Sequence, residues 1–162
     1  MSANGTATSA PTISNTNGYN AGAPGDSSNR QIATACTGVG GVGPQLSIVN
    51  NSGVALSTLA LAYHIRRYTA SADNNGLPSN NELPGYFVLY SINNGTTWTA
   101  VPVLNPAVSG TSAVLVPNTV GVTTVAATAV RLSSPWQAGS TLLVRWIDDN
   151  AITFSPDQII GI

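Results

Sequence analysis

Charge is the property that this sequence has least of. Charged residues make up 7% of the 162 residues, whereas an average soluble domain has about 25%. The chain has no lysine, and its few arginines and acidic residues leave a net charge of -1. Proteins that bind nucleic acid carry clustered positive charge on one face. The composition therefore excludes nucleic acid as an expected partner.

Cysteine and long apolar runs are also scarce. Cys36 is the only cysteine, so no disulfide can form within the chain. We expect Cys36 to be a small buried residue, because no basic neighbour would activate its thiol. An intermolecular disulfide or a reactive thiol is the alternative. No apolar stretch approaches the roughly 20 residues that span a bilayer, so membrane insertion is not expected.

The polar surface of this chain must come from Ser, Thr, Asn and Gly. Such a surface is weakly hydrated, has little self-repulsion and tolerates close contact with other surfaces. This composition is common in exported adhesive or structural bacterial proteins and unusual in cytosolic enzymes. We therefore expect an extracellular or cell-surface location.

The chain divides into an arm and one domain. Residues 1–28 contain few large apolar residues and predict a flexible arm, or a segment that a partner orders. Residues 29–162 have many short β-rich segments separated by Pro and Gly, which predicts a single antiparallel β-sandwich. The predicted strands lie at 31–38, 44–50, 56–70, 86–92, 98–104, 112–117, 122–132, 140–147 and 158–162.

Two of these segments predict how their strands are buried. In residues 56–70, Leu59, Leu61, Tyr63 and Ile65 alternate with smaller or polar residues, which indicates a half-buried strand. Residues 86–92 are apolar on both faces. This second strand is expected to be either central in its sheet or part of an interface.

The segment Ser91 to Trp98 has the strongest turn signal in the chain. Asn94 and Gly95 both tolerate a positive φ, so they predict a tight hairpin turn. Ser91 or Asn93 is expected to bond backbone amides within this turn. We therefore interpret the hairpin as structural.

The pattern Ser91-x-Asn93-x-Gly95-x-Thr97-Trp98 resembles the Asp-box of sialidases and many secreted β-proteins, with Asn93 in place of the Asp. Together with the segments "LSSPWQAGSTLLVRWIDDN" and "IIGI", it is similar to secreted bacterial jelly-roll modules appended to surface enzymes, adhesins and matrix proteins. The resemblance covers roughly residues 17–162 and implies a jelly-roll-like sandwich. The family's closing strand usually continues further than Ile162. This difference predicts either that the given sequence is truncated there or that another chain completes an open sheet edge. An incomplete sandwich exposes unpaired backbone, which invites strand addition.

Two ligand sites are conceivable from the residue types. Trp136, in a turn expected to be exposed, and Tyr68, His64 and Arg66 are candidate glycan contacts. Structural roles, including a salt bridge of Arg66 or its neighbour, are the alternative.

Asp148, Asp149 and Asn150 follow a strand and could hold a calcium ion. The alternative is a turn with an ion pair to Arg145. No other cofactor is expected.

We find no pattern that predicts catalysis. No carboxylate pair, nucleophile–histidine arrangement or phosphate loop is evident. The expected function is that of a non-catalytic structural or adhesive subunit of a filament, sheath or matrix. Its predicted partner is another copy of itself, bound by β-strand addition. The alternatives are a carbohydrate-binding module, with a surface glycan as its partner, and an accessory domain of a larger secreted hydrolase.

Overall fold

A computed structural model describes residues 2–3, 18–23, 26–36, 41–69, 86–105, 121–149 and 159–162. These residues form strands and connecting turns, with one short 3-10 helix and no α-helix. The strands build two sheets that enclose a common apolar core. The prediction of an all-β sandwich is therefore confirmed, and its jelly-roll connectivity stays a prediction.

The first sheet has six strands and the second has five, and all pairs are antiparallel except β1 with β2. The first sheet has the order β1 (Ser2–Ala3), β2 (Gly18–Ala23), β3 (Asp26–Thr34), β11 (Ile159–Gly161), β6 (Leu56–Thr69), β9 (Gly121–Trp136). In the second sheet, β4 (Gly41–Val42) and β5 (Gln45–Val49) both pair with β10 (Thr141–Asp149), followed by β7 (Phe87–Ser91) and β8 (Thr99–Ala100).

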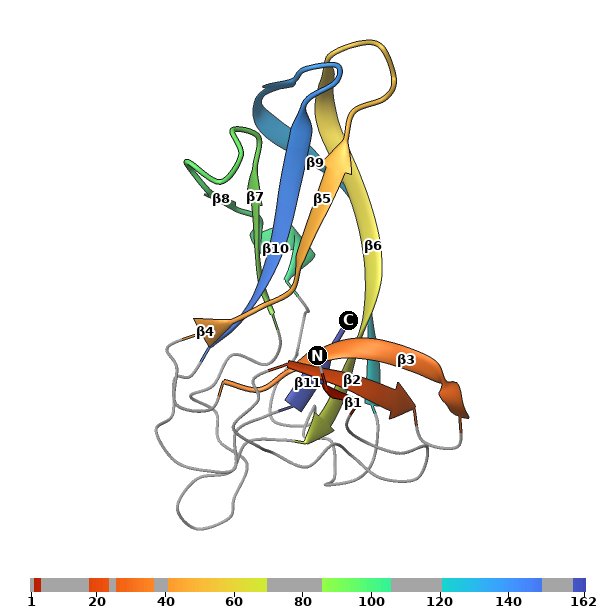
Figure 1. The fold of residues 1–162 in the computed structure, drawn as a ribbon. Helices are drawn as coiled ribbons and strands as arrows, with labels where there is room; N and C mark the ends of the chain where they lie inside the picture. The colour runs from red at the N-terminus through yellow and green to blue at the C-terminus, as the bar shows by residue number, and fades with distance from the viewer. Residues whose placement is uncertain are drawn as a thin grey trace.

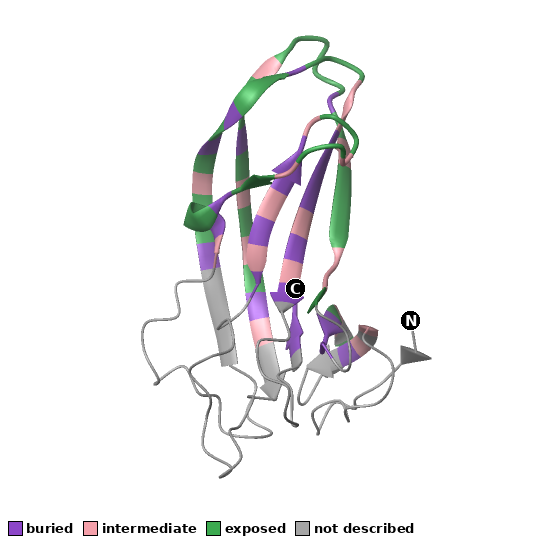
Figure 2. Ribbon diagram, turned by 90° about the vertical axis from the view of Figure 1, so that its left-hand side faces the viewer, coloured by how far each residue is buried: buried purple, intermediate pink, exposed green. Residues whose placement is uncertain are grey.

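The long strands β6 and β9 run the height of the sandwich, and β2 and β3 lie across its base (Figure 1). Buried and exposed positions alternate along the strands, as the banding in Figure 2 shows. The core between the sheets includes Leu59, Ile65, Val88, Tyr90, Val125, Val130, Leu142, Val144 and Trp146.

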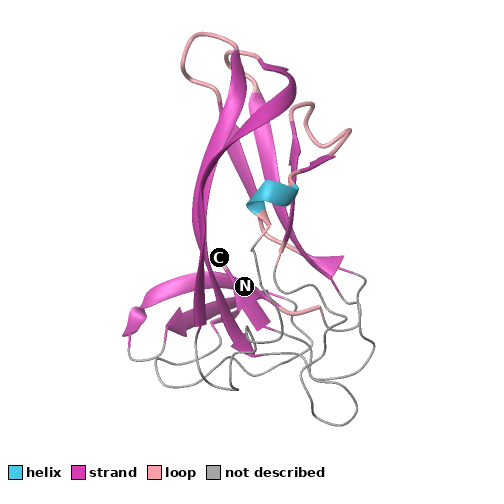
Figure 3. Ribbon diagram, turned by 180° about the vertical axis from the view of Figure 1, so that it is seen from behind, coloured by secondary structure: helices cyan, strands magenta, loops and turns pink. Residues whose placement is uncertain are grey.

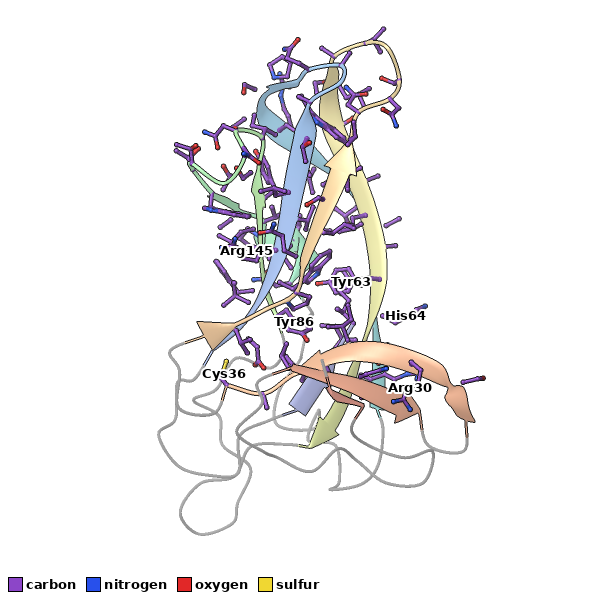
Figure 4. All side chains as sticks on the ribbon, viewed as in Figure 1. Arg30, Cys36, Tyr63, His64, Tyr86 and Arg145 are labelled. Atoms are coloured by element: carbon purple, nitrogen blue, oxygen red, sulfur yellow. The ribbon has the colours of Figure 1, made fainter. Side chains whose placement is uncertain are left out.

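Strand β6 has the two faces that its sequence predicts. Leu59 and Ile65 are buried, Tyr63 is half-buried, and Ala62 and His64 are exposed. Figure 4 shows the side chains of Tyr63 and His64 on opposite sides of the strand. Alternation places successive side chains on opposite faces of a sheet, so this part of the pattern follows from local geometry alone.

Strand β7 is central in its sheet, with β10 on one side and β8 on the other. Val88 and Tyr90 point into the core, and Phe87 and Leu89 are half-buried on the outer face. The central position explains why both faces of this segment are apolar.

The expectation of an open sheet edge at Ile162 is wrong. Strand β11 lies between β3 and β6 and pairs with both. The amide of Ile162 also donates a hydrogen bond to the carbonyl of Ile32 at 3.0 Å. Ile160 is fully buried. Burial of this apolar side chain favours the position of β11 between β3 and β6.

Strand pairing begins earlier in the chain than the predicted boundary. Strand β2 and the start of β3 lie within residues 1–28, and they pair with each other as a hairpin. The boundary at residue 28 falls inside β3. Residues 4–17, the main part of the predicted arm, lie outside the described residues.

Two further segments differ from the prediction. Residues 98–104 form only the two-residue β8, followed by the 3-10 helix η1 (Pro102–Leu104), which Figure 3 shows in cyan. Pro102 lacks the amide that a longer strand would need. The strand predicted at 112–117 lies outside the described part of the chain.

Gly43 and Pro44 connect β4 to β5 along the same side of β10. A Cβ atom at Gly43 would lie 1.7 Å from the carbonyl oxygen of Trp146. The amide of Trp146 donates to the carbonyl of Pro44 at 3.1 Å. Glycine is thus required here because two backbones approach closely.

Candidate functional site

The hairpin between β7 and β8 has a tight turn at its tip. Asn94 has φ 57° and Gly95 has φ 83°, so both adopt the left-handed conformation that the sequence predicts. These two residues favour that conformation more than most others do. Figure 1 shows this turn at one margin of the second sheet.

Side chains inside the hairpin satisfy its backbone. The Oγ of Ser91 accepts a hydrogen bond from the amide of Gly95 at 2.9 Å. The Oδ1 of Asn93 accepts one from the amide of Thr97 at 2.9 Å, and the Nδ2 of Asn93 donates to Thr97 Oγ1 at 2.8 Å. The amide nitrogen is the donor of the last bond, whereas with an Asp at this position the hydroxyl of Thr97 would have to donate instead. The side chains of Ser91 and Asn93 are therefore committed to the turn.

Trp98 is covered on one side by a cation. The guanidinium carbon of Arg145 lies 4.0 Å from the centre of the Trp98 ring, which is a cation–π contact. Arg145 also donates to Gln45 Oε1 through Nε at 3.2 Å and Nη2 at 2.7 Å. These contacts tie the hairpin to β10 and β5 on the outer face of the second sheet.

A buried polar cluster, defined here as Thr34, Cys36, Tyr86 and Asp148, lies where the base meets the second sheet. The hydroxyl of Thr34 donates to Asp148 Oδ2 at 2.8 Å. The thiol of Cys36 donates to the carbonyl oxygen of Asp148 at 2.7 Å. All four residues are buried, and Asp148 is 0% exposed. Figure 4 labels Cys36 and Tyr86 in this region.

Tyr86 connects this cluster to the last strand. Its hydroxyl donates to the carbonyl of Ile160 at 3.0 Å and lies 3.0 Å from the hydroxyl of Thr34. Burial raises the pKa of Tyr86 well above 10, and the nearby Asp148 adds to this increase. The phenol therefore stays protonated and acts as a hydrogen-bond donor.

The polar cluster joins both sheets, and each of its four residues is 3% exposed or less. It links β3, β10 and β11 with the residue preceding β7. Fully bonded polar groups in a core fix one arrangement of the strands that carry them. We interpret the cluster as a structural junction that positions the base of the sandwich.

The sequence does not predict that these four residues form one cluster. Its members lie far apart along the chain, and Thr34 has no pattern that separates it from other threonines. The available signal was Asp148, an acidic residue that directly follows an apolar strand in a chain with few acids. That position is compatible with burial and with a solvated turn.

Trp136 is not the exposed aromatic residue that the sequence predicted. It is 5% exposed and ends strand β9, opposite Leu56. Its Nε1 donates to the carbonyl of Ser140 at 2.9 Å, and its own carbonyl accepts a bond from Asn50 Nδ2 at 2.9 Å. Since these contacts satisfy its polar groups within the fold, Trp136 is buried in the core at the top of the sandwich.

The other glycan candidates lie on β6. His64 is exposed on the outer face, and Arg66 is partly buried. Among the described residues, the Nε and Nη1 atoms of Arg66 have no hydrogen-bond partner. The salt bridge expected of Arg66 or its neighbour stays a prediction. The side chain of Tyr68 lies outside the described residues. Because Trp136 is buried, the glycan prediction no longer has the exposed aromatic residue on which it mainly depended.

The calcium prediction rested on Asp148, Asp149 and Asn150. The carboxylate of Asp148 faces the interior and accepts the bond from Thr34. Arg145 lies on the outer face of the same strand, so the buried carboxylate of Asp148 does not form the ion pair with Arg145 that was considered as the alternative. The side chain of Asp149 and the whole of Asn150 lie outside the described residues. Within the part described, no three His, Cys, Asp or Glu residues are grouped as metal ligands.

Comparisons with family models, curated proteins and solved structures found no match to this chain. The resemblance to jelly-roll modules and to the Asp-box therefore remains an expectation from the residues quoted above. Nowhere in the described ranges is there a helix of the length and apolar character needed to cross a membrane.

Proposed function

We propose that this chain is a non-catalytic structural or adhesive subunit of an extracellular assembly, which associates by β-strand addition. Strand addition uses unpaired backbone groups at the edge of a sheet, and side chains at alternate positions give it specificity. The proposal therefore depends on the state of the sheet edges in this fold.

The observation that carries the proposal is the unprotected edge of β5. In the described part of the chain, β5 pairs only with β10. Proteins usually protect such an edge with charged residues or proline. Strand β5 has neither, and it exposes 42% of Leu46 and 49% of Val49. An exposed, uncharged, partly apolar edge favours pairing with another strand.

The composition supports the same function. With 7% charged residues and a net charge of -1, neighbouring subunits repel each other little. Residues 1–25 contain no charged residue at all, so this segment can lie against another subunit without charge burial.

The test compares three chains by light scattering after size exclusion and by electron microscopy. They are the full chain, a chain lacking residues 1–17, and a chain in which a Gly-Ser segment of equal length replaces residues 4–17. Cutting before residue 18 keeps the β2–β3 hairpin intact. We expect oligomers or filaments from the full chain and monomers from the other two. Stable monomers of all three at high concentration would refute the proposal.

A further inference from the structure

Asn94 and Gly95 form the kind of dipeptide that is most prone to deamidation. In this reaction the backbone nitrogen of the following residue attacks the side-chain amide carbon of an asparagine. A glycine in the second place has no Cβ to hinder the attack. The sequence has four Asn-Gly pairs, which begin at residues 4, 17, 75 and 94. Among them, the pair at residue 94 lies wholly within the described ranges.

The two reacting groups of this pair have different surroundings. Asn94 is exposed, so water reaches its side-chain amide. Gly95 is half-buried, and a Cβ atom on it would lie 3.5 Å from the ring of Trp98 and 3.7 Å from Leu143. The attacking nitrogen therefore belongs to the packed side of the turn, and the amide that it would attack belongs to the solvent side.

The amide of Gly95 is engaged by a buried hydroxyl. It donates a hydrogen bond to the Oγ of Ser91 at 2.9 Å. Ser91 is 2% exposed and ends strand β7, which holds its side chain in place. The attack requires the nitrogen to lose its proton and to move towards the Asn94 side chain. Both steps break this bond and leave the buried oxygen of Ser91 without its donor.

The position of the Ser91 proton strengthens this effect. Ser91 Oγ donates to Asn93 Oδ1 at 2.9 Å, and Oδ1 also accepts a bond from the amide of Thr97 at 2.9 Å. A hydroxyl has only one proton to donate, so Oγ presents lone pairs to Gly95. A hydrogen bond made by the neutral form of a group disfavours its charged form. Deprotonation of the Gly95 nitrogen is therefore disfavoured.

The backbone of the turn is also unsuited to ring closure. Asn94 and Gly95 both have positive φ, which defines a type I′ turn, and the carbonyl of Asn93 accepts the turn bond from the amide of Thr96 at 3.3 Å. In this turn type ψ of the first central residue is about 30°, so the next nitrogen lies roughly trans to Cβ. Ring closure needs that nitrogen beside Cβ, so the peptide unit must first turn over.

We propose that Asn94 is a deamidation site that the folded hairpin keeps closed, and that Ser91 is the residue that closes it. When the site opens, the Gly95 nitrogen bonds to the Asn94 side-chain carbon and ammonia leaves, which gives a succinimide ring. Water then opens the ring to aspartate or isoaspartate. This inference goes beyond the proposed function, and it applies to a monomer as much as to an assembled subunit.

The products would not restore the hairpin. Isoaspartate lengthens the main chain by one methylene within the turn, and both products add a negative charge. This hairpin carries Trp98, whose ring lies 4.0 Å from the guanidinium carbon of Arg145 on β10. Deamidation would therefore loosen the contact between the hairpin and the second sheet. Since the reaction is irreversible, the damage would accumulate with every opening.

The first experiment compares the deamidation rate of the wild-type chain when it is folded and when it is unfolded in guanidinium chloride. A protease that cuts after aromatic residues releases residues 91–98, which separates Asn94 from the other Asn-Gly pairs. Mass spectrometry of this fragment follows the conversion of amide to acid. We expect the rate in the folded chain to be at least about tenfold lower. Equal rates would overturn the proposal.

The second experiment tests the role of Ser91 in the folded chain. Ser91→Ala removes the hydroxyl and should raise the rate at least about tenfold. Thr97→Val is the matched control. It removes the bond from Asn93 Nδ2 to Thr97 Oγ1 at 2.8 Å and leaves Ser91 in place, so its rate should stay close to that of the wild type. If Ser91→Ala reacts no faster than the wild type, or Thr97→Val accelerates as much as Ser91→Ala does, the assignment to Ser91 is wrong.

A third measurement needs no substitution, so it stands even if circular dichroism shows that Ser91→Ala has lost its fold. Hydrogen exchange of the Gly95 amide is followed by NMR in the wild type. Gly53 is the reference, because it also has a positive φ and lies in an exposed turn. We expect Gly95 to exchange at least about tenfold more slowly than Gly53. Exchange of Gly95 as fast as that of Gly53 would show that Ser91 does not hold this amide.

Discussion

Asp148 is a carboxylate with no solvent exposure, and its partner Thr34 comes from the other sheet. Removing one member of such a pair leaves the other buried without its hydrogen bond, which costs more than the bond itself contributes. Single substitutions at Asp148 therefore measure how much the polar cluster stabilises the fold.

We predict that Asp148→Ala lowers the free energy of unfolding by about 2–3 kcal/mol. Asp148→Asn is the matched control, because it keeps an oxygen that can accept the Thr34 bond, and it should cost less than half as much. Urea denaturation followed by tryptophan fluorescence measures both. Equal stability of the wild type and the Ala variant would show that the cluster does not hold the base together.

Tyr63 and Tyr86 should make the free energy of unfolding depend on pH in the alkaline range. Burial raises the pKa of Tyr63 from 10.0 to about 12, and that of Tyr86 is also raised. The folded protein therefore holds these protons more tightly than the unfolded chain does. The free energy of unfolding should be constant up to about pH 10 and fall as pH rises from 10 through 12.

Urea denaturation at several pH values tests this dependence. Tyr63→Phe should fall less steeply than the wild type between pH 10 and 12. It loses the hydrogen bond from the Tyr63 hydroxyl to the carbonyl of Leu104, so its starting stability is also lower. A wild-type stability that does not change over this range would contradict the prediction.

At the scale of the elements, the junction between β4 and β5 depends on one glycine. Gly43→Ala would force a Cβ atom to within 1.7 Å of a backbone oxygen of β10, so the two strands must separate. We predict a loss of about 2–4 kcal/mol in unfolding free energy. Gly41→Ala is the matched control. Its nearest neighbour would be 3.4 Å away, and it should cost under about 1 kcal/mol. Thermal and urea denaturation that rank the two variants equally would contradict this account.

The strands differ in how well their sequence predicts them. Strand β6 and the 91–98 hairpin were predicted correctly because alternation and an Asn-Gly turn are local properties. The place of β11 was not, since its partners β3 and β6 are distant in sequence and three residues cannot specify them. The exposure of Trp136 was predicted wrongly for a similar reason. Its burial depends on hydrogen bonds with Ser140 and with Asn50, which is distant in sequence.

At the scale of the whole molecule, low charge determines how assembly should respond to salt. Screening by salt weakens contacts between charges, and few charges are present here. We predict that the degree of assembly changes little between about 0.05 and 1 M NaCl and increases in ammonium sulfate, which strengthens apolar contacts. Sedimentation velocity measures it. Dissociation in 1 M NaCl would show that the subunits join through ionic contacts instead.

The rate at which a reagent labels the Cys36 thiol would measure local opening at the base of the molecule. Its thiol is 1% exposed and bonded to the backbone of β10, so a thiol reagent can reach it only when that region opens. As it is the only thiol, its labelling rate reports one local event. Tryptophan fluorescence reports loss of the core instead. If labelling is faster than global unfolding, the base opens while the upper sandwich stays folded, and the two rates measure how far the halves of this domain fluctuate independently.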